Sequence, residues 1–329
     1  MDTLETAPAV HVRELCKDYG NGHRIGPLSF TVPAGSITGF VGHNGAGKTT
    51  TIRMLLGLIA ATEGTADVLG HDLRDRVGYL PSVGALVEGP TFYDGLSGRR
   101  NLLIHARLGN IPTDRIGEVL AEAGLADRAD DRVGDYSLGM RQRLGIAAAL
   151  LPRPTLLILD EPANGLDPQG TADLRTLLRR LADDGITCFI SSHLLTEVEQ
   201  LCDHLVALHQ GAVVFEGGPE ELTGGTPDAS RLQLRPDDPA DLPALAAIVA
   251  ALGHTSTEEA GWLHFSAPGE AAAICNAAAM HAGIALAELR LHQISLEEAF
   301  FNLTAAQDAS PGAATAHPLP TVSTGSRPS

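Results

Sequence analysis

The nine residues GHNGAGKTT, Gly42–Thr50, have the pattern of a glycine-rich phosphate-binding loop. Glycines allow a backbone with positive φ to bring N–H groups onto phosphate oxygens, and the positive end of the following helix points at the same anion. In such a loop Lys48 reaches the β- and γ-phosphates, and the Thr49 hydroxyl ligates Mg²⁺. The competing interpretation is an ordinary glycine-rich turn.

The segments beside this loop favour the phosphate-binding interpretation. The apolar run ITGFV, residues 37–41, precedes it and is typical of a buried strand. After the loop, apolar residues recur at helical spacing, at Ile52, Leu55, Leu56 and Ile59. The sequence therefore predicts a strand, a phosphate loop and a helix in the order that the binding mechanism requires.

Strands alternate with helices over the first two thirds of the chain. Residues 9–15 and 26–32 alternate apolar and polar side chains and predict two strands joined by a turn. Residues 155–160 and 187–191 predict further strands, with a helix between them. We expect an α/β P-loop NTPase fold with a parallel-sheet core, an N-terminal antiparallel β subdomain and a helical lobe over about residues 90–140.

Changes in composition predict the domain boundaries. Gly, Pro and small polar residues replace the periodic pattern at residues 224–230, which we expect to link a first domain, residues 1–223, to the rest. Residues 231–304 predict a small α+β accessory domain. Pro, Ala, Ser and Thr dominate residues 305–329 and indicate a disordered tail.

The chain is strongly acidic, with a net charge of -17 over 329 residues. Such a surface disfavours nucleic acid and anionic lipid as general partners. The four cysteines are far apart and form no CxxC pair, which indicates neither a zinc site nor a disulfide framework. No apolar run approaches the length that spans a bilayer, and the acidic N-terminus is unlike a signal peptide, so we expect a cytoplasmic protein.

A pair of carboxylates, Asp160 and Glu161, stands at the end of the predicted strand at residues 155–160. Asp160 suits the Mg²⁺-holding carboxylate of a P-loop NTPase, and Glu161 suits a general base that polarises an attacking water. The alternative is two solvated acids at a strand end. No N-K-x-D stretch, the motif that recognises guanine, is present, which favours ATP over GTP.

Three more residues have two interpretations each. Asp167 precedes Pro168, where a helix N-cap alone would explain it. His193, just past a predicted strand, could touch a γ-phosphate or have only a structural role. Tyr19 lies in the turn between the first two strands, where it could stack on adenine or simply pack.

Five motifs resemble, in order and spacing, those of an ABC-type ATPase. They are GHNGAGKTT (42–50), YSLGMRQR (136–143), LLILDEP (156–162), NGLDP (164–168) and SSH (191–193). They are similar to the family's Walker A loop, signature, Walker B strand, D-loop and switch histidine, and the resemblance covers residues 9 to 223. In that family two cassettes sandwich two ATP molecules, because the signature turn of one subunit closes over the ATP on the other subunit's Walker A loop.

The resemblance implies a role for each candidate residue. Ser137 and Gly139 would bind the γ-phosphate on the partner subunit, whereas the alternative for Ser137 is that it only caps a helix. Glu161 matches the catalytic base, His193 the γ-phosphate sensor, and Asp167 the loop that links the two sites. Lys48 is the third catalytic residue, at the β- and γ-phosphates. The family's nucleotide-binding positions fall on Tyr19, Gly42, Asn44, Gly45, Gly47, Lys48, Thr49 and Thr50.

Two features depart from the family's usual motifs. The signature has Leu138 and Met140 where Gly and Gln are usual, a variant that resembles drug and bacteriocin exporters. The Gln that normally senses Mg²⁺ and the membrane subunit is replaced by Glu88. The metal set implied by the resemblance is therefore Thr49, Asp160 and Glu88.

The resemblance implies an ATP-hydrolysing subunit, with ATP and Mg²⁺, that drives a separate transmembrane permease. It would act as a homodimer, or as a heterodimer with a similar ATPase, at the inner face of the cell membrane. The signature and the segment SLEEAFFNLT, residues 295–304, resemble those of exporters of drugs, antibiotics or peptides. The alternatives are a soluble ABC-type ATPase that acts on ribosomes or DNA, which the acidic charge disfavours, and a P-loop kinase, which Glu161 and the signature disfavour.

Overall fold

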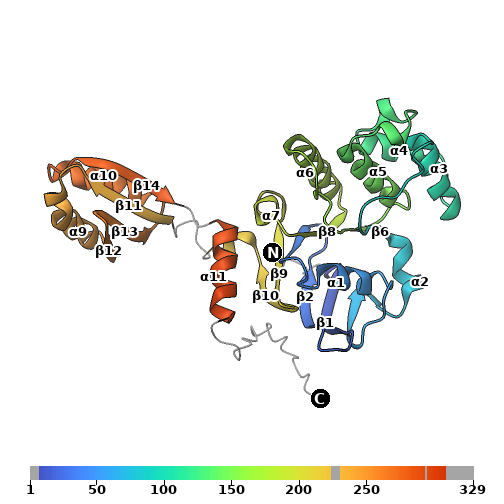
Figure 1. The fold of residues 1–329 in the computed structure, drawn as a ribbon, viewed down its shortest axis with the longest axis horizontal. Helices are drawn as coiled ribbons and strands as arrows, with labels where there is room; N and C mark the ends of the chain where they lie inside the picture. Colours follow the sequence, from blue (N-terminus) through green and yellow to red (C-terminus); the bar gives the residue numbers. More distant parts are fainter. Residues whose placement is uncertain (1–6, 224–229, 293–294, 309–329) are drawn as a thin grey trace, which may run out of the picture.

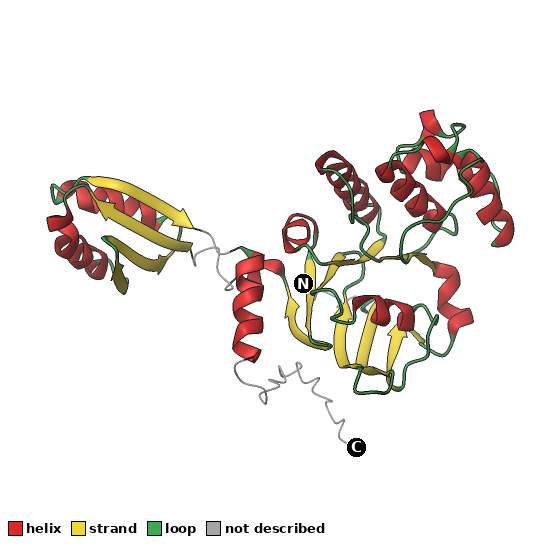
Figure 2. Ribbon diagram, in the orientation of Figure 1, coloured by secondary structure: helices red, strands yellow, loops and turns green. Residues whose placement is uncertain are grey.

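The computed structural model describes residues 7–223, 230–292 and 295–308. The first range forms a large α/β unit and the second a small α+β unit, while the last helix lies beside the large unit (Figure 1). Figure 2 shows helices on both sides of the central strands of the large unit. None of the helices in these ranges is long and apolar enough to cross a membrane.

A six-stranded sheet forms the centre of the large unit, in the order β10-β9-β3-β8-β7-β6. Pairing is parallel from β9 to β6, and only β10 at the edge is antiparallel to its neighbour. The strands are β3 (Ile37–Val41), β6 (Val83–Leu86), β7 (Leu156–Leu159), β8 (Thr187–Ser192), β9 (His204–His209) and β10 (Ala212–Gly217). Every residue of β3, β7 and β8 is buried, as expected for a sheet covered on both faces. The predicted parallel core is confirmed.

A second, antiparallel sheet packs against the first. It has the order β2-β1-β4-β5 and consists of β1 (Val10–Asp18), β2 (Arg24–Val32), β4 (Glu63–Val68) and β5 (His71–Asp72). The Phe30 ring on β2 lies 5.2 Å from the Phe40 ring and 6.0 Å from the Phe189 ring, between ring centroids. This aromatic cluster joins the two sheets and confirms the predicted antiparallel subdomain.

The helices of the large unit cover the parallel sheet and form a lobe beside it. They are α1 (Lys48–Leu55), α2 (Arg76–Tyr79), α3 (Gly98–Leu108), α4 (Arg115–Glu122), α5 (Leu138–Leu150), α6 (Pro168–Asp183), α7 (Leu195–Leu201) and α8 (Pro219–Leu222). Three short 3₁₀ turns lie at Leu80–Ser82, Ala126–Arg128 and Val133–Asp135. Leu102, Leu120 and Leu144, one from each of α3, α4 and α5, share a buried core, which confirms the predicted helical lobe.

The small unit has its own core. Its antiparallel sheet has the order β12-β13-β11-β14, and apolar residues of β11 and β13 are buried together with those of two helices. The elements are β11 (Ser230–Pro236), a 3₁₀ turn (Pro239–Asp241), α9 (Leu242–Ala251), β12 (Ser256–Glu259), β13 (Trp262–Ala267), α10 (Ala271–His281) and β14 (Leu286–His292). The predicted α+β architecture is confirmed.

The last helix, α11 (Leu296–Asp308), packs on the large unit. Leu296 and Phe300 are fully buried in the large unit's core, next to α7 and α8. The prediction grouped this segment with the accessory domain and began the tail at residue 305, whereas residues 305–308 are helical here. An apolar stripe at a spacing of four residues predicts burial, but it does not say which unit supplies the partner surface. The predicted linker, apart from Ser230, and the tail from residue 309 onward lie outside the described residues.

Candidate nucleotide-binding site

The phosphate loop connects β3 to α1, as predicted. Gly47 has a φ of 108°, and a Cβ added there would lie 2.6 Å from Cγ2 of Ile25, so only glycine fits. Gly45 also has a positive φ, of 85°. Helix α1 begins at Lys48 without a side-chain cap, so its first backbone N–H groups are left for an anion.

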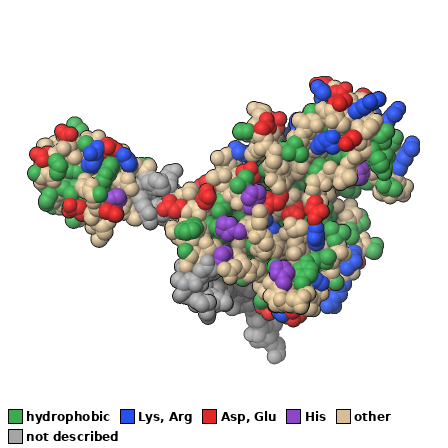
Figure 3. Space-filling model, viewed as in Figure 1, with side chains coloured by type: hydrophobic (Ala, Val, Ile, Leu, Met, Phe, Trp, Pro, Cys, Tyr) green, Lys and Arg blue, Asp and Glu red, His purple; other side chains and the backbone are tan. Residues whose placement is uncertain are grey.

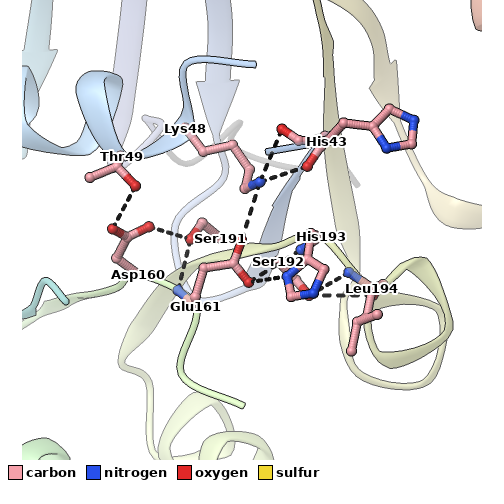
Figure 4. A network of polar contacts seen from close by, with 10 residues as sticks. His43, Lys48, Thr49, Asp160, Glu161, Ser191, Ser192, His193 and Leu194 are labelled. Carbon is pink, nitrogen blue, oxygen red and sulfur yellow. Dashed lines mark hydrogen bonds and ion pairs between the residues drawn. The ribbon is translucent and has the colours of Figure 1, made fainter. Parts of the chain in front are cut away.

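Lys48 lies across this loop and is almost completely buried, with 6% of its surface exposed. Its Nζ donates a hydrogen bond to the Gly42 carbonyl at 2.6 Å and lies 3.2 Å from Oε1 of Glu161 (Figure 4). The ammonium group also lies 3.5 Å from the His43 carbonyl, so two carbonyls and one carboxylate hold it. Phosphate oxygens bound in the loop would compete with these groups for the same three N–H donors.

Asp160 connects the phosphate loop to the end of β8. The Thr49 hydroxyl donates to Oδ2 of Asp160 at 2.8 Å, and the Ser191 hydroxyl donates to Oδ1 at 2.6 Å. Ser191 also accepts a hydrogen bond from the backbone N–H of Glu161 at 2.8 Å. Ser191 was not among the predicted site residues, although it opens the SSH motif. Its role follows from the pairing of β7 with β8, which places it beside Asp160.

The residues present fit a magnesium ion. The Thr49 hydroxyl and the Asp160 carboxylate are oxygen ligands within hydrogen-bond distance of each other, and Mg²⁺ prefers one or two such ligands together with phosphates and waters. Over the described ranges, no cluster of three or more His, Cys, Asp or Glu side chains could hold a metal by itself. A magnesium ion held by these two oxygen ligands together with the phosphates of a nucleotide agrees with both the Thr49–Asp160 contact and the lack of a larger cluster in the described ranges.

Glu161 and His193 form a pair beside the lysine. Oε2 of Glu161 lies 2.7 Å from Nδ1 of His193 and accepts a bond from the His193 backbone N–H at 3.3 Å. Glu161 has a positive φ of 49°, the left-handed region in which non-glycine residues are uncommon. One carboxylate oxygen thus faces Lys48 and the other faces His193, a geometry suited to a general base whose second oxygen is fixed.

Two of the predicted residues lie at the periphery of this network. The Tyr19 hydroxyl is 3.4 Å from Oγ1 of Thr50, and the side chain is half exposed. Its ring centroid lies 5.5 Å from that of His23 and 5.6 Å from the Lys17 ammonium. Glu88, predicted as a metal ligand, instead forms an ion pair with Arg53 of α1. Among the described residues no contact joins Glu88 to Thr49 or Asp160, so its metal role stays a prediction.

The signature turn and the D-loop lie beside each other, apart from this network. The Ser137 hydroxyl accepts a hydrogen bond from the Met140 N–H at 3.2 Å and caps α5. The Asp167 carboxylate accepts one from the Gly170 N–H at 2.9 Å and caps α6. A Cβ on Gly139 would lie 3.9 Å from Cα of Gly170, so the two helix starts are neighbours. The capping roles are satisfied within the chain. No contact of these residues with Lys48 or Glu161 is found in the described part of the chain.

Comparison with known proteins identifies the family. A family model described as "ABC transporter" matches residues 25–164. The bacitracin transport ATP-binding protein BcrA of Bacillus licheniformis is 48% identical over 210 residues, which cover 63% of this chain and 69% of BcrA. The lantibiotic transport ATP-binding protein SrtF of Streptococcus pyogenes is 36% identical over 62% of this chain and 89% of SrtF.

A solved structure of an ATP-binding subunit of an ABC transporter superposes with a TM-score of 0.57. It is 29% identical and covers 65% of this chain and 91% of that subunit. Fold, motif order and relatives agree. The chain belongs to the family of ABC transporter ATP-binding proteins.

Proposed function

We propose that the chain binds ATP with Mg²⁺ and hydrolyses the ATP to ADP and phosphate in order to drive a separate transmembrane permease. The observation that supports this most directly is the position of Glu161 between Lys48 and His193. A kinase needs a bound acceptor. A carboxylate held beside the phosphate loop can instead polarise a water molecule.

The contacts suggest how ATP binding prepares hydrolysis. Phosphate oxygens would draw the Lys48 ammonium away from the Gly42 carbonyl and from Oε1 of Glu161, because a polyphosphate is the stronger anion. This exchange frees Oε1 to accept a proton from the attacking water, while Oε2 stays held by His193. Mg²⁺ held at Thr49 and Asp160 would neutralise charge on the transferred phosphoryl group.

We further propose that two cassettes share each ATP. Ser137 and Gly139 lie at the start of a 13-residue helix, where backbone N–H groups favour an anion, and they make no described contact with this chain's own phosphate loop. The γ-phosphate on a partner subunit would supply that anion. Asp167, whose helix begins beside this turn, would link the two sites.

The helical lobe is the proposed contact with the permease. Large apolar side chains are exposed on this part of the chain, with 82% of Leu108 and 65% of Tyr93 accessible. Figure 3 shows Lys and Arg side chains interspersed with Asp and Glu side chains over the lobe, and Arg99 forms an ion pair with Asp130 there. Exposed apolar side chains rimmed by charged ones are typical of a protein interface. Glu88, at the usual Gln position, would lie in the same contact.

The relatives' names indicate the cargo class. Because the named relatives are described as bacitracin and lantibiotic transport proteins, we propose that the permease exports an antibiotic or a peptide. The chain would then lie at the inner face of the cell membrane, attached through the permease.

The test is to tag the chain, extract native membranes in mild detergent and identify by mass spectrometry what co-purifies. We expect a protein with several membrane spans in two copies, or two such proteins, absent from a parallel preparation of the untagged strain. Recovery only in the soluble fraction, with ribosomal or DNA-bound material, would contradict the permease and favour the soluble alternative.

A further inference from the structure

His43 connects the phosphate loop to the last helix of the chain. Its carbonyl accepts a hydrogen bond from the Ala46 N–H at 3.0 Å and lies 3.5 Å from the Lys48 ammonium. Its ring points away from Lys48 (Figure 4) and lies 5.6 Å from the Phe300 ring, between centroids, at an interplanar angle of 54°. One residue thus shapes the loop with its backbone and contacts α11 with its side chain.

Phe300 is a fixed partner for this ring. Only 3% of its surface is exposed, and one turn earlier Leu296 is completely buried in the same core. The Phe300 carbonyl accepts a hydrogen bond from the Thr304 hydroxyl at 3.0 Å. The adjacent Phe301 differs, since 68% of its surface is exposed. Helix α11 also packs on α7, which begins two residues after His193.

We propose that Phe300 is a positioning residue for the phosphate loop. By holding the His43 ring, it keeps the His43 carbonyl where it closes the loop and faces Lys48. Phe300 touches no reacting atom and acts only through His43. The proposal deepens the function proposed above and rests on it for the catalytic meaning of the loop, but its primary prediction concerns nucleotide affinity.

The position of α11 in the chain gives this contact a second consequence. The helix follows β14, the last strand of the small unit, and only residues 293–294 and Ser295 separate the two elements. The small unit is therefore followed directly in the chain by the helix that contacts the phosphate loop.

A double-mutant cycle on the full-length chain tests the contact. A fluorescent ATP analogue is titrated against wild type, Phe300→Leu, His43→Ala and the double variant, with a thermal melt of each protein without nucleotide. Leucine keeps most of the buried apolar volume but removes the ring. We expect Phe300→Leu to weaken binding by about 3- to 10-fold, the range of an aromatic pair, and the double variant to be no weaker than His43→Ala. Phe301→Ala is the matched control and should bind like wild type.

Two results would overturn the proposal. In the first, Phe300→Leu lowers the melting temperature but leaves the affinity for the analogue unchanged, so that the helix only stabilises the fold. In the second, the effects of the two substitutions add, so that Phe300 acts independently of His43. A wild-type chain that binds the analogue but hydrolyses no ATP would count against the proposed function alone, because the affinity cycle would still decide on Phe300.

Discussion

Replacement of Glu161 by glutamine removes the proposed base while keeping the shape of its side chain. The amide oxygen can still accept from His193, but the side chain can no longer take a proton or pair with Lys48. We expect the ATP hydrolysis rate to fall about 10²- to 10⁴-fold, the span of a lost general base, which raises the activation free energy by about 3 to 5 kcal/mol.

The affinity for ATP should not fall with the hydrolysis rate in the Glu161→Gln variant. In the wild type the Glu161 carboxylate competes with phosphate oxygens for the Lys48 ammonium, so the neutral amide should leave ATP affinity unchanged or stronger. ATP bound but not hydrolysed should then hold the dimer closed. Light scattering with saturating ATP should show a dimer of the Glu161→Gln variant and a monomer without nucleotide.

The assay is phosphate release by the purified chain, with nucleotide affinity measured in parallel. Glu199→Gln is a matched control, because Glu199 is an exposed carboxylate on α7 outside the network, and it should keep wild-type rates. Hydrolysis by Glu161→Gln within a few-fold of wild type would refute the base assignment. A parallel loss of ATP affinity would show that Glu161 builds the binding site, and a variant that stays monomeric in ATP would count against the sandwich.

Three further predictions follow from contacts elsewhere in the large unit. Ser137→Arg should abolish hydrolysis but leave the ATP affinity of each chain nearly intact. A loss of ATP affinity as large as the loss of hydrolysis, measured by titration, would contradict the proposed role across the dimer. Burial raises the pKa of the Cys188 thiol to about 12, so iodoacetamide at pH 8 should label it only after denaturation; labelling of the native chain, detected by mass spectrometry, would refute this. Burial alone would raise the pKa of Glu216, but contacts from His204 and Thr31 outweigh it and hold the pKa below its usual 4.5. The stability that Glu216 contributes is therefore present above pH 4.5 and lost as the pH falls through the lowered pKa. Urea titrations at a series of acid pH values should show the free energy of unfolding falling more steeply with pH for wild type than for Glu216→Gln. Equal dependence of that free energy on pH in the two proteins would contradict this role of Glu216.

The sequence predicted the features whose chemistry is confined to one short segment. The phosphate loop is such a case, since Gly47 must combine a positive φ with close contact to Ile25, and no other residue type meets both demands. The order of strands and helices was equally visible in the apolar periodicity. Asp160, Glu161 and His193 were named as candidates because each lies at the end of a predicted strand or just past it.

Contacts between distant segments were harder to predict. Ser191 bridges Asp160 and the Glu161 backbone only because β8 pairs with β7, and periodicity does not give strand order. The ion pair of Glu88 with Arg53 likewise depends on how a loop lies over α1. The apolar stripe of α11 predicted burial without indicating its partner surface. In each case the sequence does not say which distant segments lie next to each other in the folded chain.

The central claim is that each ATP is enclosed by the Lys48 loop of one copy and the Ser137 turn of another. The most direct test is to measure the ATPase activity of Lys48→Ala, of Ser137→Arg and of an equal mixture of the two. Each variant alone should be inactive, because both of its shared sites carry the defect. In the mixture half of the dimers contain one intact site, so about a quarter of the wild-type activity should return. A mixture as inactive as its components would contradict a site shared between two copies of this chain.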